Sequence, residues 1–168
     1  MATISPRAAA VLLALALSAQ ETPRFLRPPP KQPIPFSHRA HLTLKLECKN
    51  CHQMADPGEF AGLPPTGVCM SCHTAIKKDS PAIQRLAEYH NAKGEVPWAR
   101  VNRIADYVYF SHKEHLARAK ATCETCHGPV QRRDVLGREK DITSMAACMD
   151  CHRARSASLA CDYCHEQR

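Results

Sequence analysis

The sequence has 168 residues, with 23 lysines and arginines against 16 aspartates and glutamates, which gives a formal net charge of +7. Aromatic residues make up only 5% of the chain and its mean hydropathy is −0.39, which is consistent with an apolar interior that side chains do not mainly supply. The chain also holds ten cysteines, so its chemistry depends on whether they form disulfides, bind metal or attach a cofactor.

The N-terminus has the pattern of an export signal. MATISPR carries one positive charge and leads into AAAVLLALALSA (8–19), an apolar run of twelve residues with one serine. Spanning a bilayer takes about 20 apolar residues, so this run has the length of a signal-peptide core instead. Cleavage sites are offered by Ala16-x-Ser18 and Leu17-x-Ala19. We expect a signal peptide over 1–19 and export to the periplasm; the alternatives are an uncleaved anchor or a buried helix.

A proline-rich arm follows. QETPRFLRPPPKQPIP (20–35) has six prolines in sixteen residues, a composition typical of an extended segment without a core of its own. We interpret it as a spacer rather than a strap for a partner. The domain proper is expected over 36–168.

The domain contains an internal duplication. PFSHRAHL (35–42) returns as YFSHKEHL (109–116), which predicts two related halves, 36–109 and 110–168. The first half carries an insert in which Ser80-Pro81 begins a helix and Gly94 ends it. DYVYF (106–110) has the pattern of a short strand. The rest is expected to form loops and helices of two or three turns.

Each half leads from its histidine pair into the pattern C-x-x-C-H. Cys48-Lys49-Asn50-Cys51-His52 is followed by CMSCH (69–73), CETCH (123–127), CMDCH (148–152) and CDYCH (161–165). Disulfides require neither this spacing nor the histidine, zinc does not require a histidine directly after the second cysteine, and a thiol redox pair is normally single. Covalent c-type haem requires two thiols and an adjacent imidazole. The sequence therefore predicts five covalently bound haem c groups at all ten cysteines: Cys48, Cys51, Cys69, Cys72, Cys123, Cys126, Cys148, Cys151, Cys161 and Cys164.

Five haems in one short chain determine the expected architecture. About 149 residues remain after residue 19, or roughly thirty per haem, so the haems themselves must form the core. We expect a multihaem cytochrome c fold: a haem-packed core with short helices, extensive loops and little β structure. Haem propionates would also bring the net charge to about +1 oxidised and about −4 reduced. The basic sequence is therefore no indication of a nucleic-acid partner.

The histidines match the irons in number. Five belong to the motifs and are predicted iron ligands: His52, His73, His127, His152 and His165. Five remain as candidates for the sixth position: His38, His41, His112, His115 and His90. The two i, i+3 pairs project from one side of a turn but diverge enough to reach different haems. His90 lies on the apolar face of its expected helix, and Met145 is the alternative because a thioether also binds haem iron.

An aromatic residue, then His-x-x-His, then C-x-x-C-H, as in the stretch from Phe36 to His52, resembles the class III multihaem cytochromes c. SPAIQRLAEY, EVPWARV, DYVYFSHKEHL, CETCHGPV and SMAACMDCH are similar to stretches of the pentahaem cytochrome subunits of alternative complex III, a quinol-oxidising respiratory complex. The resemblance covers nearly all of 35–168. It implies a periplasmic electron relay whose partners are redox proteins, including iron–sulfur or quinol-oxidising subunits of a membrane complex. It also implies that His38 and His112 serve the haems of their own next motifs, while His41 and His115 reach haems attached elsewhere.

Two classes of function remain. An electron carrier passes single electrons between partners and has no catalytic residues of its own. A multihaem reductase of the nitrite or hydroxylamine type needs one iron with an open sixth site, marked in some enzymes by C-x-x-C-K. That motif is absent and the histidines suffice for every iron, so the sequence favours electron transfer. Only eight residues separate His152 from Cys161, so we expect the last two haems to be neighbours in one near-continuous row.

Overall fold

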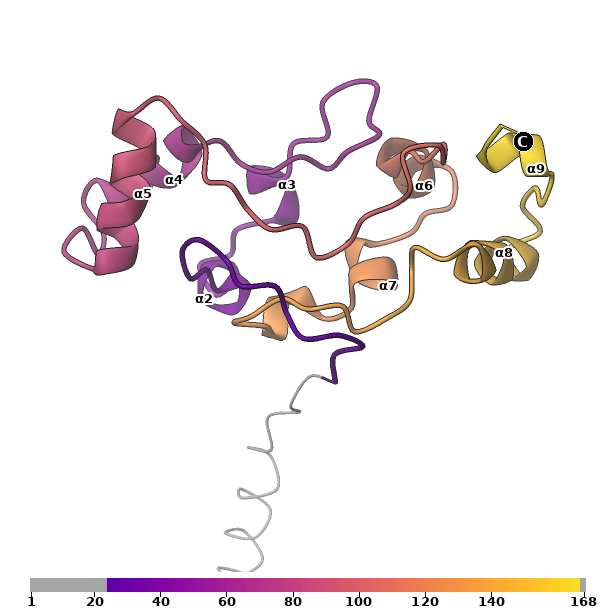
Figure 1. Cartoon of the computed structure of the whole chain (residues 1–168), viewed down its shortest axis with the longest axis horizontal. Coiled ribbons are helices and arrows are strands. Elements are labelled where there is room, and N and C mark those ends of the chain that lie inside the picture. Colours follow the sequence, from indigo (N-terminus) through magenta and orange to yellow (C-terminus); the bar gives the residue numbers. More distant parts are fainter. Residues whose placement is uncertain (1–23, 167–168) are drawn as a thin grey trace, which may run out of the picture.

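The computed structural model describes residues 24–166; the predicted signal peptide lies outside this range. Short helices joined by long loops make up the described chain (Figure 1). They are α2 (His38–Leu42), α3 (Cys48–Cys51), α4 (Thr66–His73), α5 (Pro81–Asn91), α6 (His112–Ala117), α7 (Cys123–His127), the 3-10 turn η1 (Val130–Arg132), α8 (Met145–Ala154) and α9 (Cys161–Cys164). Within residues 24–166 no helix is both long enough and apolar enough to cross a bilayer.

Serine caps begin four of these helices. In each case the hydroxyl accepts a backbone N–H of the first helical turn, which is the usual role of serine at this position. The capping residues are Ser37 for α2, Ser80 for α5, Ser111 for α6 and Ser144 for α8. These local signals explain why such short segments become helical at all, since isolated helices of this length are unstable in water.

The insert helix α5 agrees with its sequence signals. Ser80 caps its start, Pro81 is its first residue, and the Gly94 N–H bonds back to the carbonyl of Tyr89 at 2.9 Å. The left-handed residue at its end is Lys93, with φ of 54°, one position before the glycine that the sequence suggested as the stop.

The strand expected over 106–110 does not form. This segment makes a single antiparallel bridge, Val108 with His165, and the described residues contain no longer strand pairing. A strand needs a neighbouring strand of comparable length. Here the chain after α9 offers one pairing position only, at His165. The prediction of a strand was therefore wrong, whereas the expectation of little β structure is confirmed.

The side-chain core is small and lies at one end of the molecule. Among the described residues only Ile34, Leu86 and Val96 are buried hydrophobics, packed with side chains from α4, α5 and Trp98. Many large apolar side chains elsewhere are exposed, among them Leu44, Phe60, Leu63, Ile76, Tyr107, Tyr109, Met145 and Tyr163. A protein interior of this size fits a fold whose main apolar mass is a prosthetic group.

The proline-rich arm is extended, as its composition predicts, but it is not a free spacer. The Gln32 side chain bonds both backbone groups of Ala99, at 2.9 and 3.0 Å, and Ile34 enters the core. Nearer the N-terminus, the Leu26 N–H bonds the carbonyl of Arg138 at 2.7 Å. The arm therefore ties the first-half insert to a loop of the second half.

The two halves are interlocked through their histidine helices. The Arg39 N–H of α2 bonds the Arg133 carbonyl of the second half at 3.0 Å, and its guanidinium pairs with Asp134. In the same way, the Lys113 N–H of α6 bonds the Gly58 carbonyl of the first half at 3.1 Å. Each helix is thus held by the loop that follows the first motif of the other half.

Candidate haem-binding sites

The five C-x-x-C-H motifs lie on short helices that bring both thiols of each motif to one side. Positions i and i+3 of a helical turn share a face, so a C-x-x-C spacing presents two sulfurs together. In α3 the Glu47 N–H bonds the Asn50 side chain at 2.6 Å, and in α7 the Thr122 N–H bonds Thr125 at 3.1 Å. The variable residues inside these motifs therefore cap their own helices. All ten cysteines are free, and each is at least partly exposed.

In the first half, two imidazole pairs face each other. The rings of His38 and His52 are nearly parallel, at 7°, with centroids 6.3 Å apart. The rings of His41 and His73 have centroids 6.1 Å apart. Two imidazoles on opposite faces of one iron have centroids roughly 6 Å apart, because each Nε2 lies about 2 Å from the metal and about 1 Å from its ring centre. Both pairs fit this arrangement.

The second half repeats the arrangement. The centroids of His112 and His127 are 6.4 Å apart with an angle of 10°, and those of His115 and His152 are 6.2 Å apart. Aromatic packing alone does not explain why one spare histidine meets one motif histidine four times at nearly the same separation. The donor set therefore fits four irons, each between two imidazoles.

Hydrogen bonds at Nδ1 orient most of these rings. A carbonyl can only accept, so an imidazole bonded to one at Nδ1 carries its proton there and leaves the Nε2 lone pair for a metal. Carbonyl contacts of 2.7 to 3.0 Å are made by His41, His52, His73, His112, His115, His152 and His165. The Asn102 amide nitrogen lies 3.3 Å from Nδ1 of His127; the amide oxygen can accept the Nδ1 proton only if the amide group is turned over.

Electrostatics also favour the ligand form of His38. Burial, together with the neighbouring His52 and His41 rings, lowers the pKa of His38 to about 4. The neutral imidazole is the form that binds a metal. His38 is therefore neutral at physiological pH and available as a donor.

The motifs follow one another in space in a different order from the sequence. Along the long axis of the molecule α4 comes first, then α3 and α7, and then α8 with α9 (Figure 1). For each pair of adjacent motifs, burial raises the pKa of one cysteine, and a cysteine of the other motif raises this pKa further. These neighbours are Cys69 and Cys51, Cys48 and Cys123, Cys126 and Cys151, and Cys148 and Cys164. The motif helices thus form one unbroken row, and the α3 motif lies between those of α4 and α7.

His165 of the last motif has a different neighbour. Among residues 24–166 the ring packed against it is that of Tyr107, with centroids 6.3 Å apart at 87°. A phenol oxygen lies farther from its ring centre than Nε2 does, so a tyrosine ligand would lie farther from His165 than the paired imidazoles lie from each other. Tyr107 therefore packs against His165 and is not positioned as its counterpart.

The structure does not bring His90 to this last site. His90 lies on α5, where its Nδ1 is 3.3 Å from the Thr66 hydroxyl at the start of α4. Helix α5 is at one end of the molecule and α9 is at the other (Figure 1). This position does not favour the expectation that His90 completes the remaining iron, which stays a prediction. The apolar face of α5 packs on α4 and on Ile34 of the arm.

Met145, the alternative, begins α8 and leaves its side chain 63% exposed. It precedes Cys148 by three residues, so both lie on one face of the helix. Cys148 is the residue of α8 that neighbours Cys164 of the last motif. Met145 thus shares a helix face with Cys148, whose neighbours include Cys164 of the last motif.

Sequence reasoning missed the residues that contact the imidazoles at Nδ1, on the side of the ring away from the metal-binding Nε2. These are the backbone carbonyls of Glu59 and Gly62 and the side chain of Asn102. A carbonyl has no signal in the sequence, and Asn102 lies 25 residues before His127 without a motif to connect them. Phe36 and Phe110, by contrast, carry a signal, because each precedes its histidine pair by two residues and stacks on the second imidazole at 4.4 and 4.5 Å.

Comparison with known proteins identifies related multihaem cytochromes. Residues 16–97 match the class III cytochrome c family, and residues 108–166 match cytochrome c7 and related cytochromes c. The chain is also 31% identical to the multihaem cytochrome c subunit of menaquinone reductase from Nitratidesulfovibrio vulgaris strain Hildenborough, over 93% of this chain and 87% of that protein.

The chain belongs to the class III multihaem cytochromes c. Membership implies covalently bound haem c and a role in electron transfer. The first family match includes α5 and ends at residue 97, and the second begins at residue 108, so the two matches agree with two related halves. This cytochrome thus has the expected fold class: short helices, long loops and a core left mainly to its haems.

Proposed function

We propose that this cytochrome is an exported pentahaem electron carrier that works in the periplasm. Each C-x-x-C-H motif holds one haem c, and the protein carries electrons one at a time between redox partner proteins. The observation that carries this proposal is the fourfold recurrence of facing imidazoles at 6.1 to 6.4 Å, each joining a motif histidine to a spare one. Haem iron, when bound, changes between ferric and ferrous states by one electron.

The proposed ligand set follows from the pairs. His52, His73, His127, His152 and His165 are the fifth ligands, one from each motif. The sixth ligands of the first four are His38, His41, His112 and His115, in that order. Two imidazoles close each of these irons to exogenous ligands, which suits electron transfer rather than substrate binding. The Nδ1 contacts fix the rings and increase their basicity.

For the iron of the last motif we propose Met145 as the sixth ligand. Support comes from the position of Met145 on the Cys148 side of α8 and from its exposed thioether. A thioether ligand raises the reduction potential relative to a second imidazole. The end of the row at α9 would then have the highest potential, which favours the movement of electrons toward that end.

The partners we propose are subunits of a quinone-linked membrane complex, including iron–sulfur or quinol-oxidising proteins. Support comes from the relative, which is a subunit of a menaquinone reductase. Purification from native membranes in mild detergent tests this directly. Co-elution with such subunits is the expected result, whereas recovery of all the protein in the soluble periplasmic fraction would contradict it.

Haem stoichiometry is the test of the core proposal. A pyridine haemochrome assay combined with mass spectrometry should give five haems per chain, attached at all ten cysteines. A variant with Cys161→Ser and Cys164→Ser should give four and serves as the matched control. Free thiols, disulfides or bound zinc in protein matured by a host with haem-attachment machinery would overturn the proposal.

A second function has one observation in its favour. His165 packs against Tyr107 and not against an imidazole, which leaves room for an open site at that iron and hence for a reductase of the nitrite or hydroxylamine type. The resting ferric protein distinguishes the two. A high-spin signal, or binding of nitrite or cyanide, would support the reductase; a fully low-spin spectrum supports the carrier.

A further inference from the structure

A pocket of about 200 Å³ lies where three distant segments of the chain meet: the arm, the stretch after α5 and the loop before α8. It is lined by Arg27, Pro28, Pro30, Arg100, Val101 and Arg138. Three guanidinium groups thus surround one space, and no carboxylate is among the lining residues. Neighbouring contacts hold these segments in place, since the Leu26 N–H bonds the Arg138 carbonyl and Gln32 bonds Ala99.

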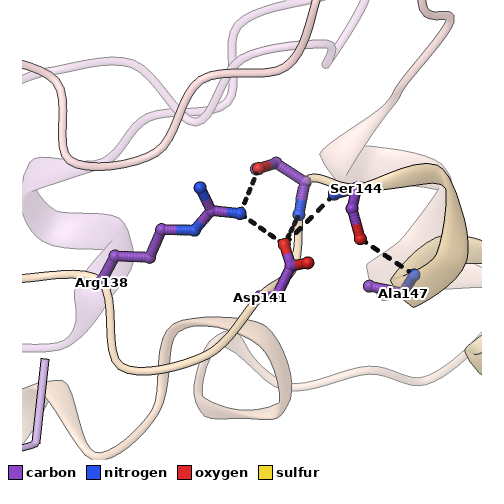
Figure 2. Close-up of polar contacts among 5 residues, drawn as sticks. Arg138, Asp141, Ser144 and Ala147 are labelled. Carbon is purple, nitrogen blue, oxygen red and sulfur yellow. Dashed lines mark hydrogen bonds and ion pairs between the residues drawn. The ribbon is translucent and has the colours of Figure 1, made fainter. Parts of the chain in front are cut away.

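Arg138 uses only part of its hydrogen-bonding capacity. Its Nη2 bonds Asp141 and, at 2.7 Å, the Thr143 hydroxyl, next to the residues that cap α8 (Figure 2). Its Nε is buried and has no hydrogen-bond partner among the described residues. Buried N–H donors are almost always partnered in folded proteins, so this atom indicates an acceptor that the chain itself does not supply.

The other two arginines, unlike Arg138, have no carboxylate partner among the described residues. The Arg100 guanidinium lies over the Phe60 ring, 5.8 Å from its centroid. Within residues 24–166 neither Arg27 nor Arg100 forms an ion pair with a carboxylate. Arg133, in the same loop as Arg138, is by contrast paired with Glu139 at 2.6 and 2.8 Å. Arg27 and Arg100 therefore bring positive charge to the pocket that no described carboxylate pairs, and this charge favours an anion there.

Two of the segments that line the pocket contact the α7 motif within two residues of a lining arginine. Two residues after Arg100, the Asn102 amide contacts the His127 ring at 3.3 Å. Two residues after Arg138, the Lys140 ammonium lies 3.5 Å from the Thr125 carbonyl of α7. The stretch after α5 and the loop before α8 therefore both lead from the pocket to α7.

We propose that Arg27, Arg100 and Arg138 form a binding site for a carboxylate beside the α7 haem site. Guanidinium groups bind carboxylates through paired, charge-assisted hydrogen bonds, and Arg27 and Arg100 line the pocket without a carboxylate partner among the described residues. The inference rests on the proposed function, because it places the site next to a haem. A carboxylate of this kind can come from a haem propionate or from a free carboxylate anion, and the experiment below separates the two sources.

The experiment compares the holoprotein with Arg100→Gln, Arg27→Gln and Arg138→Gln. The matched control is Arg103→Gln, since Arg103 is three residues from Arg100 but is 71% exposed and pairs with Asp106. Haem content is measured first on every sample. Spectroelectrochemical titration then follows the haem midpoint potentials with sodium citrate or with sodium chloride at equal ionic strength. Fewer than five haems in the wild type would count against the proposed function. If the wild type and the variants all carry five haems, a change in midpoint potential tests the carboxylate site alone.

For a haem propionate we expect the pocket variants to lower the midpoint potential of one haem, because an unpaired negative charge stabilises the ferric state. Citrate would then have no saturable effect on the wild type. For a free carboxylate, citrate should lower one potential in the wild type saturably, and the pocket variants should lose this response. The inference is overturned if all three variants match Arg103→Gln and citrate acts no differently from chloride. Because Arg138 also supports the cap of α8, Arg27→Gln and Arg100→Gln are decisive if Arg138→Gln does not fold.

Discussion

At the residue scale, the His-x-x-His pair is a compact way to serve two irons from one helical turn. Phe36 stacks on His41 at 4.4 Å and meets His38 edge-on at 4.8 Å, so a single ring separates and orients both imidazoles. Phe110 does the same for the second pair, at 4.5 and 4.8 Å. The two rings of each pair consequently point to different motif histidines.

We expect His41→Ala to change a haem that is not the next in sequence. His41 faces His73 of the second motif, although the first motif comes between them in the sequence. Loss of His41 should therefore open the iron of the haem attached at Cys69 and Cys72. Electron paramagnetic resonance of the ferric protein should show one high-spin centre and four unchanged ones. His90→Ala is the control and should leave every haem low-spin. A high-spin signal from His90→Ala would contradict the ligand set.

Met145→Ala should affect only the last haem. Loss of a thioether ligand should remove its charge-transfer absorption near the red end of the spectrum and turn that one haem high-spin. The midpoint potential of this haem should fall, because the thioether favours the ferrous state. Met149→Ala, in the same helix, is the matched control. Identical spectra for the two variants would show that the sixth site of the last haem is filled in another way or is open.

Residue patterns alone could predict most of these assignments but not the role of His90. The C-x-x-C-H motifs and the duplicated histidine pairs can be recognised from residue types and spacing alone. The position of His90 depends on what covers the apolar face of α5. Helical periodicity identifies that face, yet only the fold reveals that α4 and Ile34 of the arm pack there. The Nδ1 carbonyl contacts are equally invisible, because every residue carries a carbonyl.

At the element scale, the second-half loop 129–139 holds helix α2 and is itself held by a buried ion pair. The Arg133 and Glu139 side chains are 9% and 15% exposed and form two hydrogen bonds. The Arg133 carbonyl of this loop accepts the Arg39 N–H of α2. The loop therefore connects a buried charge pair to the position of His38 and His41.

Glu139→Ala should be strongly destabilising. It leaves the Arg133 charge buried without this partner, which typically costs about 3–5 kcal/mol. Thermal unfolding of the holoprotein, followed by circular dichroism, should show a clearly lower transition temperature. Glu88→Ala is the control: it breaks the exposed pair with Arg85, and the transition temperature should barely change. Equal effects of the two variants would mean that the buried pair does not hold the loop.

The outcome for the elements differs between helices and strand for a physical reason. The α5 helix depends on local signals, a serine cap and a following glycine, and these can be read from Ser80 and Gly94. A strand depends on a partner elsewhere in the chain. The β-forming residues at 106–110 find only one position of His165 to pair with, so their propensity has no effect beyond a single bridge.

At the scale of the whole molecule, the duplication produces a nearly two-fold arrangement. The motifs of α4 and α3 on one side correspond to those of α8 and α7 on the other, with Cys48 next to Cys123 at the centre. Helix α5 is added at one end and α9 at the other. This order could not be read from the sequence, because the first motif along the chain, α3, lies inside the row and the second, α4, lies at its end.

The last motif is attached more loosely than the rest, which makes a truncation informative. Helix α9 is joined to the second half through the Tyr109 N–H to the Cys164 carbonyl, at 2.7 Å, and through the bridge of Val108 with His165. The first four motifs, in contrast, share the interlocked helices α2 and α6. A chain that ends at residue 160 should therefore still fold and carry four haems. Its low-spin bis-histidine signals should match those of the full chain.

Removal of an interior motif should have the opposite result. A variant with Cys48→Ser and Cys51→Ser loses the haem site between α4 and α7, and His38 then has no iron to bind. Because this site forms part of the core that both halves share, we expect little or no stable protein to accumulate. Haem staining of the periplasmic fraction, with mass spectrometry of the purified chains, measures both cases. A truncated chain that fails to accumulate, or an interior variant that is as stable as the full chain, would contradict a four-haem core with one appended site.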